Sequence, residues 1–425
     1  MKSREPFSTS SLFLPSITVV PPIVALIGAT IDGQRKIRDS QGYLTWTSSS
    51  DYSEDISKYF YALLVGVAIL VLIKDALQQQ ELLSLPLTLV LWPIALLTGQ
   101  ILRVDLSGAI TTAASSIVLL AILISRSTDG DYKLVARIIV LIAAAASIYA
   151  VLQPERALIE CRADKCTAWG VLVTSFMPQE NVLALFALGG LTIVLYALSG
   201  LERALSVMLV LAILLSTGSR GAIIAGAGVL AVHFYGFVYR RWNGRSAMLL
   251  KLISLVPLIF TAASGAVFFA PGLFGSLTGR DFIMRLLHTY WVQSPFIGPG
   301  REVLTEAFNS GNSANYLISH EHGQVPYVLI SGGIIGTICF SIWLIAMVNQ
   351  TRVFGKEQIA LMGVLIGMSI VFLTEPVWQF DVRASTFWSL AFASALYLRI
   401  KRTLSHPNKF HLTHRSVRNL RGKKK

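Results

Sequence analysis

Charged residues are scarce in this chain of 425 residues, at 14% of the sequence. Soluble domains usually carry about a quarter charged residues. Apolar residues make up 54%, which is more than the core of one soluble domain would bury. The scarcity of charge therefore excludes a soluble protein. Repeated apolar stretches of about 20 residues instead predict an all-α polytopic membrane protein.

Acidic residues are absent from the C-terminal end, where ten Lys and Arg lie between Arg399 and Lys425. Positive charge gathers on the cytoplasmic side of membrane proteins. Residues 401–425 are therefore predicted to form a basic cytoplasmic tail, which would also attract anionic membrane lipids. The tail does not indicate nucleic-acid binding, because Phe410 is the one aromatic residue among its basic residues, and bases stack on aromatic side chains.

The sequence shows no internal repeat and no separate soluble domain, and we expect no cleavable signal peptide. Its first apolar run contains three prolines and no small-residue cleavage site, so we interpret it as a membrane helix. About twelve spans are predicted within one transmembrane domain over 1–400, with both termini cytoplasmic. The orientation of the first helix is less consistent with this rule, because the basic residues Arg35, Lys36 and Arg38 follow it on the predicted outer side. The predicted spans are 12–31, 59–77, 82–101, 108–125, 134–152, 182–198, 201–217, 220–238, 249–270, 323–348, 358–375 and 384–400.

Cysteine is rare, and two of the three cysteines lie in one of two long predicted periplasmic loops. These loops cover about 153–181 and about 271–322, and loops of that length are usually functional. Cys161 and Cys166 lie in the first loop with no further Cys or His nearby, which argues against a metal site. They form either a disulfide in an oxidising compartment or two free thiols.

Four polar stretches lie at the predicted outer ends of apolar segments. They are Met177–Asn181, Ser216–Gly221, Gly279–Gly300 and Ser319–His322. Arg220 opens an apolar helix, where the helix dipole favours an anion, so a bound anion would explain an arginine there. Snorkelling at the helix end is the alternative. Arg280, Arg285 and Arg301 add positive charge on the same side, and guanidinium groups suit phosphate oxygens.

Histidines near these stretches are candidates for proton transfer. His320 or His322 could accept a proton from a sugar hydroxyl, although each alone is compatible with an ordinary loop histidine. A metal at this pair lacks an obvious third ligand. Asp129-Gly130-Asp131 has the D-x-D form of sugar-nucleotide enzymes, but its predicted cytoplasmic position favours a solvated turn. We therefore expect neither a metal nor a cofactor.

The order of these stretches resembles the O-antigen ligase and polymerase superfamily of bacterial envelopes. The counterparts of its motifs are Pro178–Asn181, Ser219-Arg220-Gly221, Gly279-Arg280 with Pro295–Gly300, and His322 with Gly333–Gly336. The resemblance covers about residues 170–350. The chain departs from the family at three positions. Gly323 stands where the family has an Asn after the histidine, and the tryptophan expected soon after Gly-Arg lies farther along, at Trp291. Glu180 lengthens the first motif by one residue.

The resemblance implies a glycosyltransferase of the bacterial inner membrane. It would move a glycan from undecaprenyl diphosphate to an acceptor at the periplasmic face, without nucleotide or metal. The acceptor would be a growing polysaccharide in a polymerase, which we favour slightly, or lipid A–core in a ligase. Arg220 and Arg280 would stabilise the leaving diphosphate, and His322 would act on the acceptor. The expected substrate-binding residues are Asn181, Arg285, Arg301 and His320.

Two other functional classes fit the same sequence. A transporter, such as a flippase of lipid-linked oligosaccharides, would also have about twelve helices. A transporter should carry charged residues along a pathway through the membrane, whereas here most charge lies at one face. A non-catalytic partner of other polysaccharide-assembly proteins is the third interpretation.

Overall fold

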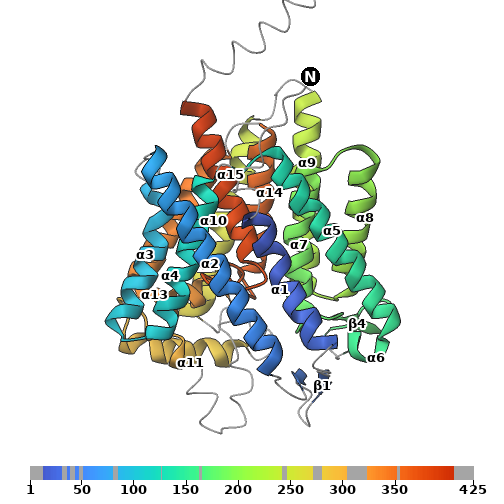
Figure 1. The fold of residues 1–425 in the computed structure, drawn as a ribbon, viewed down its shortest axis with the longest axis horizontal. Helices are drawn as coiled ribbons and strands as arrows, with labels where there is room; N and C mark the ends of the chain where they lie inside the picture. Colours follow the sequence, from blue (N-terminus) through green and yellow to red (C-terminus); the bar gives the residue numbers. More distant parts are fainter. Residues whose placement is uncertain are drawn as a thin grey trace, which may run out of the picture.

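Helices make up nearly all the regular structure of this chain (Figure 1). The structure is a computed structural model that describes residues 13–30, 36–38, 44–46, 51–79, 85–125, 127–161, 165–241, 247–270, 280–303, 323–351 and 355–405. Within these residues, each of the predicted spans overlaps one long helix. The long helices are α1 (Phe13–Thr30), α2 (Asp51–Gln79), α3 (Leu87–Leu102), α4 (Leu106–Ile124), α5 (Asp129–Leu152), α7 (Glu180–Ala197), α8 (Gly200–Ser216), α9 (Arg220–Arg241), α10 (Ala247–Phe269), α13 (Gln324–Gln350), α14 (Lys356–Val371) and α15 (Phe387–Ser405).

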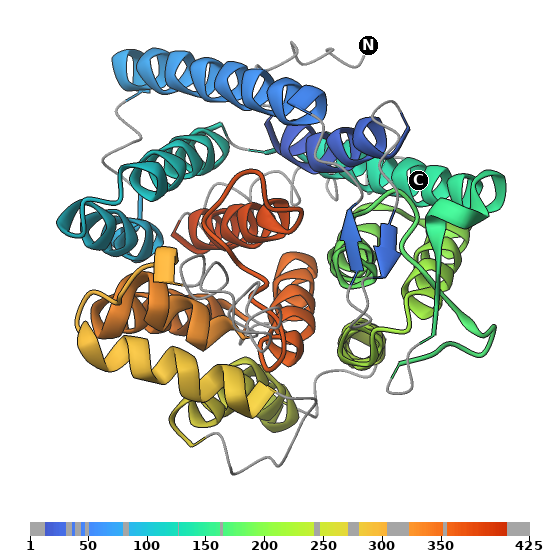
Figure 2. The same cartoon turned by 90° about the horizontal axis from the view of Figure 1, so that it is seen from below.

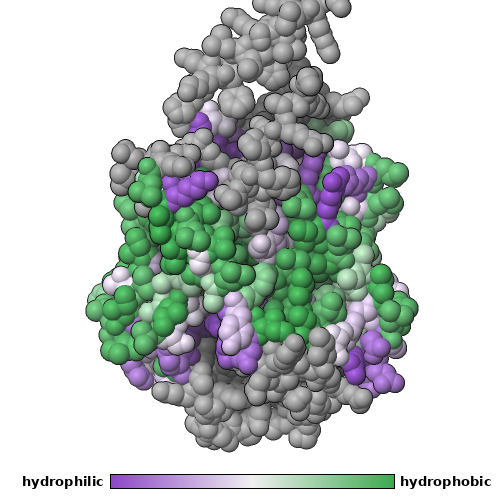
Figure 3. All heavy atoms as spheres, viewed as in Figure 1, coloured by the Kyte–Doolittle hydropathy of each residue, from purple (hydrophilic) through white to green (hydrophobic). Residues whose placement is uncertain are grey.

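Eight helices in the described part of the chain are long and apolar enough to cross a membrane, and α3 is a shorter apolar helix. The prediction of an all-α polytopic membrane protein is therefore confirmed, while the number of twelve spans stays a prediction. Large apolar side chains such as Leu70, Ile110 and Phe234 are exposed on the outside of the bundle. Figure 3 shows a broad hydrophobic band on one face of the bundle, with hydrophilic residues at its upper and lower rims. Lipid would cover this band.

The helices run side by side and alternate in direction, with α14 and α15 near the centre of the bundle (Figure 2). Aromatic side chains fill this centre, and Trp378, Phe387 and Trp388 are almost completely buried. Gly189 on α7 permits the close approach of α15, because a Cβ there would lie 2.9 Å from the Trp388 ring. We call the lower end of the bundle in Figure 1, where α7, α9 and α13 begin, the motif face.

Regular structure also occurs inside both predicted long loops. The first contains α6 (Pro154–Ala157) and an antiparallel hairpin of β3 (Leu158–Glu160) and β4 (Val171–Val173). The second contains α11 (Arg280–Gln293), which lies across the motif face (Figure 1). One side of α11 buries Ile283, Met284 and Leu287 against α10 and α13. A further hairpin, β1 (Lys36–Arg38) with β2 (Leu44–Trp46), follows α1.

Candidate functional site

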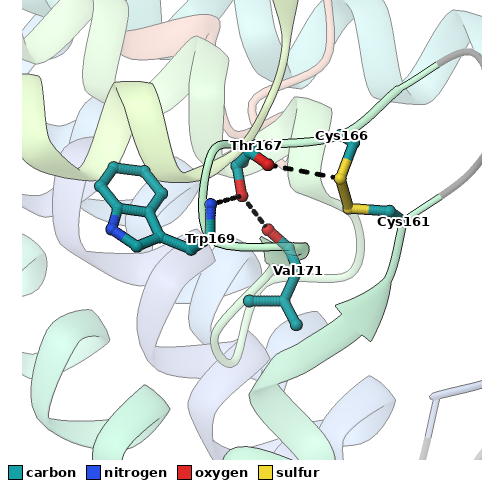
Figure 4. The surroundings of a disulfide bond; sticks show 5 residues. All are labelled: Cys161, Cys166, Thr167, Trp169 and Val171. Atoms are coloured by element: carbon teal, nitrogen blue, oxygen red, sulfur yellow. Dashed lines mark hydrogen bonds between the residues drawn. A yellow bond between two sulfur atoms is a disulfide. The ribbon is translucent and has the colours of Figure 1, made fainter.

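A disulfide joins Cys161 and Cys166 at the end of the β3–β4 hairpin (Figure 4). The hairpin end is tightened further by Thr167, whose hydroxyl donates to the carbonyl of Val171 at 2.5 Å. Of the two alternatives that the sequence left open, the structure therefore has the disulfide. Lys165 directly precedes Cys166, so the crosslink fixes the backbone from which the lysine side chain extends.

Lys165 enters a buried polar network at the start of α7. Its Nζ donates to Oε1 of Glu180 at 2.9 Å and to Oδ1 of Asn181 at 2.7 Å. Lys165 and Glu180 are only 8% and 6% exposed. The amide nitrogen of Asn181 then donates to Oε1 of Glu375 at 3.1 Å. Asn181, a predicted substrate-binding residue, is therefore held from two sides by charged groups.

Glu375 belongs to the α14–α15 connection (Phe372–Thr386), an irregular segment that enters the bundle. Trp378 on this segment is completely buried. Gln324 accepts from the Trp378 backbone nitrogen at 2.8 Å and donates to its carbonyl at 2.9 Å. The Tyr327 hydroxyl accepts from the Phe380 nitrogen at 3.1 Å. Side chains of α13 therefore satisfy the buried backbone groups of this irregular segment, as buried polar groups require.

The α14–α15 connection meets the starts of three motif helices within four residues. The Phe372 carbonyl accepts from the backbone nitrogen of Gln324 at the start of α13, at 3.0 Å. Thr374 lies beside α9, since a Cβ on Gly221 would be 3.5 Å from its hydroxyl oxygen. Glu375 binds Asn181 at the start of α7. The starts of α7, α9 and α13, three helices that carry or follow predicted motifs, therefore converge on residues 372–375.

A pocket of about 480 Å³ lies between α1, α2, the start of α7 and the α14–α15 connection. Its polar wall contains Gln179, Asn181, Glu375, Gln379 and Arg383. Its apolar wall comes from α1, through Pro21, Val24 and Ala25. The pocket therefore joins an apolar surface, from a helix at the edge of the bundle, to the polar network.

Arg383 at this pocket forms a two-pronged ion pair with Asp381. Its Nε lies 3.0 Å from Oδ1, and its Nη2 lies 2.9 Å from Oδ2. The Asp381 hydrogen bonds raise the pKa of the Arg383 guanidinium above its ordinary value, and the nearby positive charge of Arg301 opposes that shift. Arg301 itself stacks over the Tyr327 ring, 5.7 Å from its centroid. Arg301, a predicted substrate-binding residue, therefore lies in the surroundings of the α14–α15 connection.

The other predicted site residues are more scattered. Arg220 is the exposed first residue of α9, and Arg285 lies on the exposed side of α11. Arg280 is the first residue of α11, but its side chain lies outside the described residues, as do His320 and His322 entirely. Gly323, which follows His322, lies beside the Phe372 carbonyl. The structure thus places Asn181, Arg220, Arg285 and Arg301 on the motif face, and the roles of all the predicted site residues stay predictions.

The Pro295–Gly300 motif contacts a break in helix α13. Gly333 interrupts this helix with φ 61° and ψ −156°, a conformation essentially restricted to glycine. The break frees the nitrogens of Ile334 and Ile335, which donate to the carbonyls of Pro295 and Phe296 at 2.8 and 3.2 Å. In return, the Ile330 carbonyl accepts from the Gly300 nitrogen at 2.9 Å. The glycines of both motifs therefore have a structural role, because they allow one backbone to cap the other.

Arg103, at the end of α3, forms hydrogen bonds with the Pro295–Gly300 turn. Its guanidinium donates to the carbonyls of Ile297 at 2.5 Å, Gly298 at 3.0 Å and Ser331 at 3.0 Å. Such charge-assisted bonds to carbonyls of both segments are stronger than neutral ones. The arginine therefore holds the Pro295–Gly300 turn against the break in α13.

Replacing Gly298 by Ala should lower the thermal unfolding midpoint of the purified protein. Gly298 has φ +74°, and a Cβ there would lie 2.6 Å from the Leu329 carbonyl oxygen and 2.8 Å from the Gly333 nitrogen. Backbone strain alone costs about 1–3 kcal/mol. Gly66→Ala is the matched control, since its Cβ would meet nothing within 4 Å. Equal midpoints for the two variants would contradict the close packing of this turn.

The D-x-D sequence is not a solvated turn, so that prediction was wrong. Asp129 and Asp131 lie in the first turn of α5, where Thr128 and Asp131 form a reciprocal capping box. Asp129 pairs with Arg399 at 2.7 Å. The carboxylates therefore stabilise the start of α5, where negative charge interacts favourably with the helix dipole. Among the residues the structure describes, no group of three or more His, Cys, Asp or Glu could hold a metal ion.

Three residues of this network and pocket were not predicted from the sequence: Lys165, Glu375 and Arg383. The α14–α15 connection carries Glu375, Asp381 and Arg383 within nine positions, between two apolar runs. That density of charge at the predicted outer end of two spans was the available signal. Lys165 had no comparable signal, because its partners lie 15 and 16 residues away in another element.

Comparison with protein families and with curated proteins identified no relative of this chain. No protein-family model matches the chain, and no curated protein matches it significantly. The resemblance to the O-antigen ligase and polymerase superfamily therefore stays a prediction from its motifs, and a functional assignment depends on the geometry of the motif face.

Proposed function

We propose that this chain is a membrane glycosyltransferase that moves a glycan from a lipid diphosphate to an acceptor hydroxyl at the motif face. In this proposal the motif face is the periplasmic face of a bacterial inner membrane. Twelve helices cross that membrane and both termini are cytoplasmic. A growing polysaccharide is slightly favoured over lipid A–core as the acceptor. Neither nucleotide, metal nor cofactor takes part.

The observation that supports this proposal most strongly is the convergence on residues 372–375. Phe372, Thr374 and Glu375 contact the starts of α13, α9 and α7 respectively. A transfer reaction needs a donor site and an acceptor site within reach of each other. Helix starts favour bound anions, and Arg220 adds a guanidinium at one of them.

The distribution of buried charge favours an interfacial enzyme over a transporter. Among the residues with a described burial, the buried charged side chains are Asp131, Lys165 and Glu180. Asp131 and Glu180 lie in the first turns of their helices, and Lys165 lies in the β3–β4 hairpin. A transport pathway would be expected to place ionisable groups in the middle of the helices.

The proposed chemistry is a direct displacement at the anomeric carbon of the donor sugar. The acceptor oxygen forms a bond to that carbon while His322 takes the hydroxyl proton. The bond from the carbon to the diphosphate oxygen breaks, and its electron pair leaves with the lipid diphosphate. Arg220 and Arg280 would stabilise the charge that develops on this leaving group. Such a displacement inverts the anomeric configuration.

Replacing Arg220 by Lys should slow glycan transfer by roughly 30- to 150-fold, from an expected loss of about 2–3 kcal/mol in transition-state binding. A lysine keeps the charge but cannot reproduce a two-pronged contact with phosphate oxygens. The rate would be measured with purified protein in nanodiscs and a lipid-diphosphate-linked glycan. Arg137→Lys is the control, because Arg137 is an exposed arginine of α5 that pairs with Glu202 of α8. Unchanged transfer in the Arg220 variant would reject the anion site.

A further inference from the structure

We infer that the pocket between α1, α2, the start of α7 and the α14–α15 connection is a subsite for neutral sugar, which receives the glycan of the acceptor. This inference rests on the proposed function and names the acceptor-binding part of the same face. The pocket volume of about 480 Å³ falls within the range of small-molecule sites.

The lining of the pocket suits sugar hydroxyls. Gln179, Asn181 and Gln379 contribute amide groups, and Ser385 and Thr386 contribute hydroxyls. Amides both donate and accept hydrogen bonds, and a carboxylate accepts several. A sugar hydroxyl also both donates and accepts, so it can pair with every one of these groups. Glu375 supplies the carboxylate, and Asn181 orients it through the 3.1 Å bond to Oε1.

The charge of the pocket argues against a diphosphate as its ligand. The positive charge of Arg383 is offset by its two-pronged pair with Asp381, and Glu375 adds a carboxylate to the lining. Lys165 binds Glu180 and Asn181 rather than lining the pocket. A neutral ligand with many hydroxyls uses the same acceptors.

The position of the pocket matches an acceptor. Thr374 lies beside the start of α9, where Arg220 is proposed to hold the donor, and the next residue, Glu375, lines the pocket. A sugar in the pocket would therefore lie next to the donor site. Val24 and Ala25 of α1 form the opposite wall, and this apolar surface would accommodate the lipid end of a lipid-linked acceptor.

The test uses cysteine reporters in a Cys339→Ala background of the full chain in nanodiscs, because Cys339 is a free thiol. A Ser385→Cys variant reports on the pocket, and a Ser219→Cys variant reports on the start of α9. A panel of methyl glycosides and farnesyl diphosphate serve as probes. A probe at four times its dissociation constant should slow maleimide labelling about fivefold. We expect methyl glycosides to protect the Ser385→Cys variant and farnesyl diphosphate to protect only the Ser219→Cys variant.

Adding Glu375→Gln should weaken the glycoside protection, because a charge-assisted hydrogen bond to a carboxylate is stronger than a neutral one to an amide, while farnesyl diphosphate protection stays intact. Glutamine keeps an oxygen for the Asn181 bond but loses the negative charge, and Gln379→Ala provides a second variant of the same wall. The inference is overturned if no glycoside protects, if farnesyl diphosphate protects the Ser385→Cys variant, or if both pocket variants leave glycoside protection unchanged. Absence of farnesyl diphosphate protection at the Ser219→Cys reporter alone would instead reject the donor site of the proposed function.

Discussion

Replacing Lys165 by Met is expected to lower the free energy of unfolding by about 3–5 kcal/mol, because it leaves the carboxylate of Glu180 buried without its charged partner. Both side chains are less than a tenth exposed, and their charged atoms are 2.9 Å apart. A methionine fills similar space, so the loss would come from the charge rather than from a cavity. Reversible unfolding of the purified protein would measure the change.

Two further variants distinguish the effect of burying an unpaired charge from the effect of losing an ion pair. Arg137 and Glu202 are also 2.8 Å apart, but their side chains are 60% and 45% exposed. Arg137→Met should therefore leave the free energy of unfolding nearly unchanged, since exposed pairs contribute little. The double variant Lys165→Met with Glu180→Gln should recover most of the loss, because neither charge then remains buried alone. A double variant as unstable as Lys165→Met would show that the lysine acts mainly through its bond to Asn181.

The helices were predictable because each is encoded locally. An apolar run of about 20 residues predicts a membrane helix whatever surrounds it. The predicted span 134–152 lies inside α5, and 220–238 lies inside α9. The ends were less accurate, because they depend on caps such as the Thr128–Asp131 box rather than on hydropathy.

The α14–α15 connection could not be predicted, because its place in the bundle depends on distant residues. Trp378 and Phe380 stand among charged and polar residues that are typical of an exposed loop. Their backbone is instead bonded by Gln324 and Tyr327, which lie more than fifty positions away in another helix. No local pattern records that pairing, so the pocket and Glu375 were missed.

Sequence motifs located the motif face but did not separate structural residues from chemical ones. Gly298 and Gly300 belong to a motif that resembles one of a transferase family. Their backbone meets the break in α13 at Gly333. A glycine pattern is the same whether the backbone approaches a ligand or another helix. The distinction needed the three-dimensional contacts.

His322→Ala is expected to reduce glycan transfer by about 100- to 10,000-fold, the usual contribution of a general base. The histidine precedes Gly323, the residue whose backbone lies beside the Phe372 carbonyl. Gly323 therefore lies beside the segment 372–375, on which the starts of α7, α9 and α13 converge. Donor binding should be unchanged, because the proposed anion site consists of arginines. Transfer and farnesyl diphosphate binding would be measured in parallel on the same preparation.

His320→Ala is the matched control and should be milder, because His320 lies two positions farther from the start of α13. A pH profile adds a readout that altered folding would not reproduce. Loss of a general base should remove the rise of the transfer rate with pH near the ordinary histidine pKa of about 6.5. An inactive His320 variant beside an active His322 variant would mean that the other histidine acts on the acceptor. If both variants are active, no histidine acts as the base, and the arginines accelerate transfer by stabilising the leaving group alone.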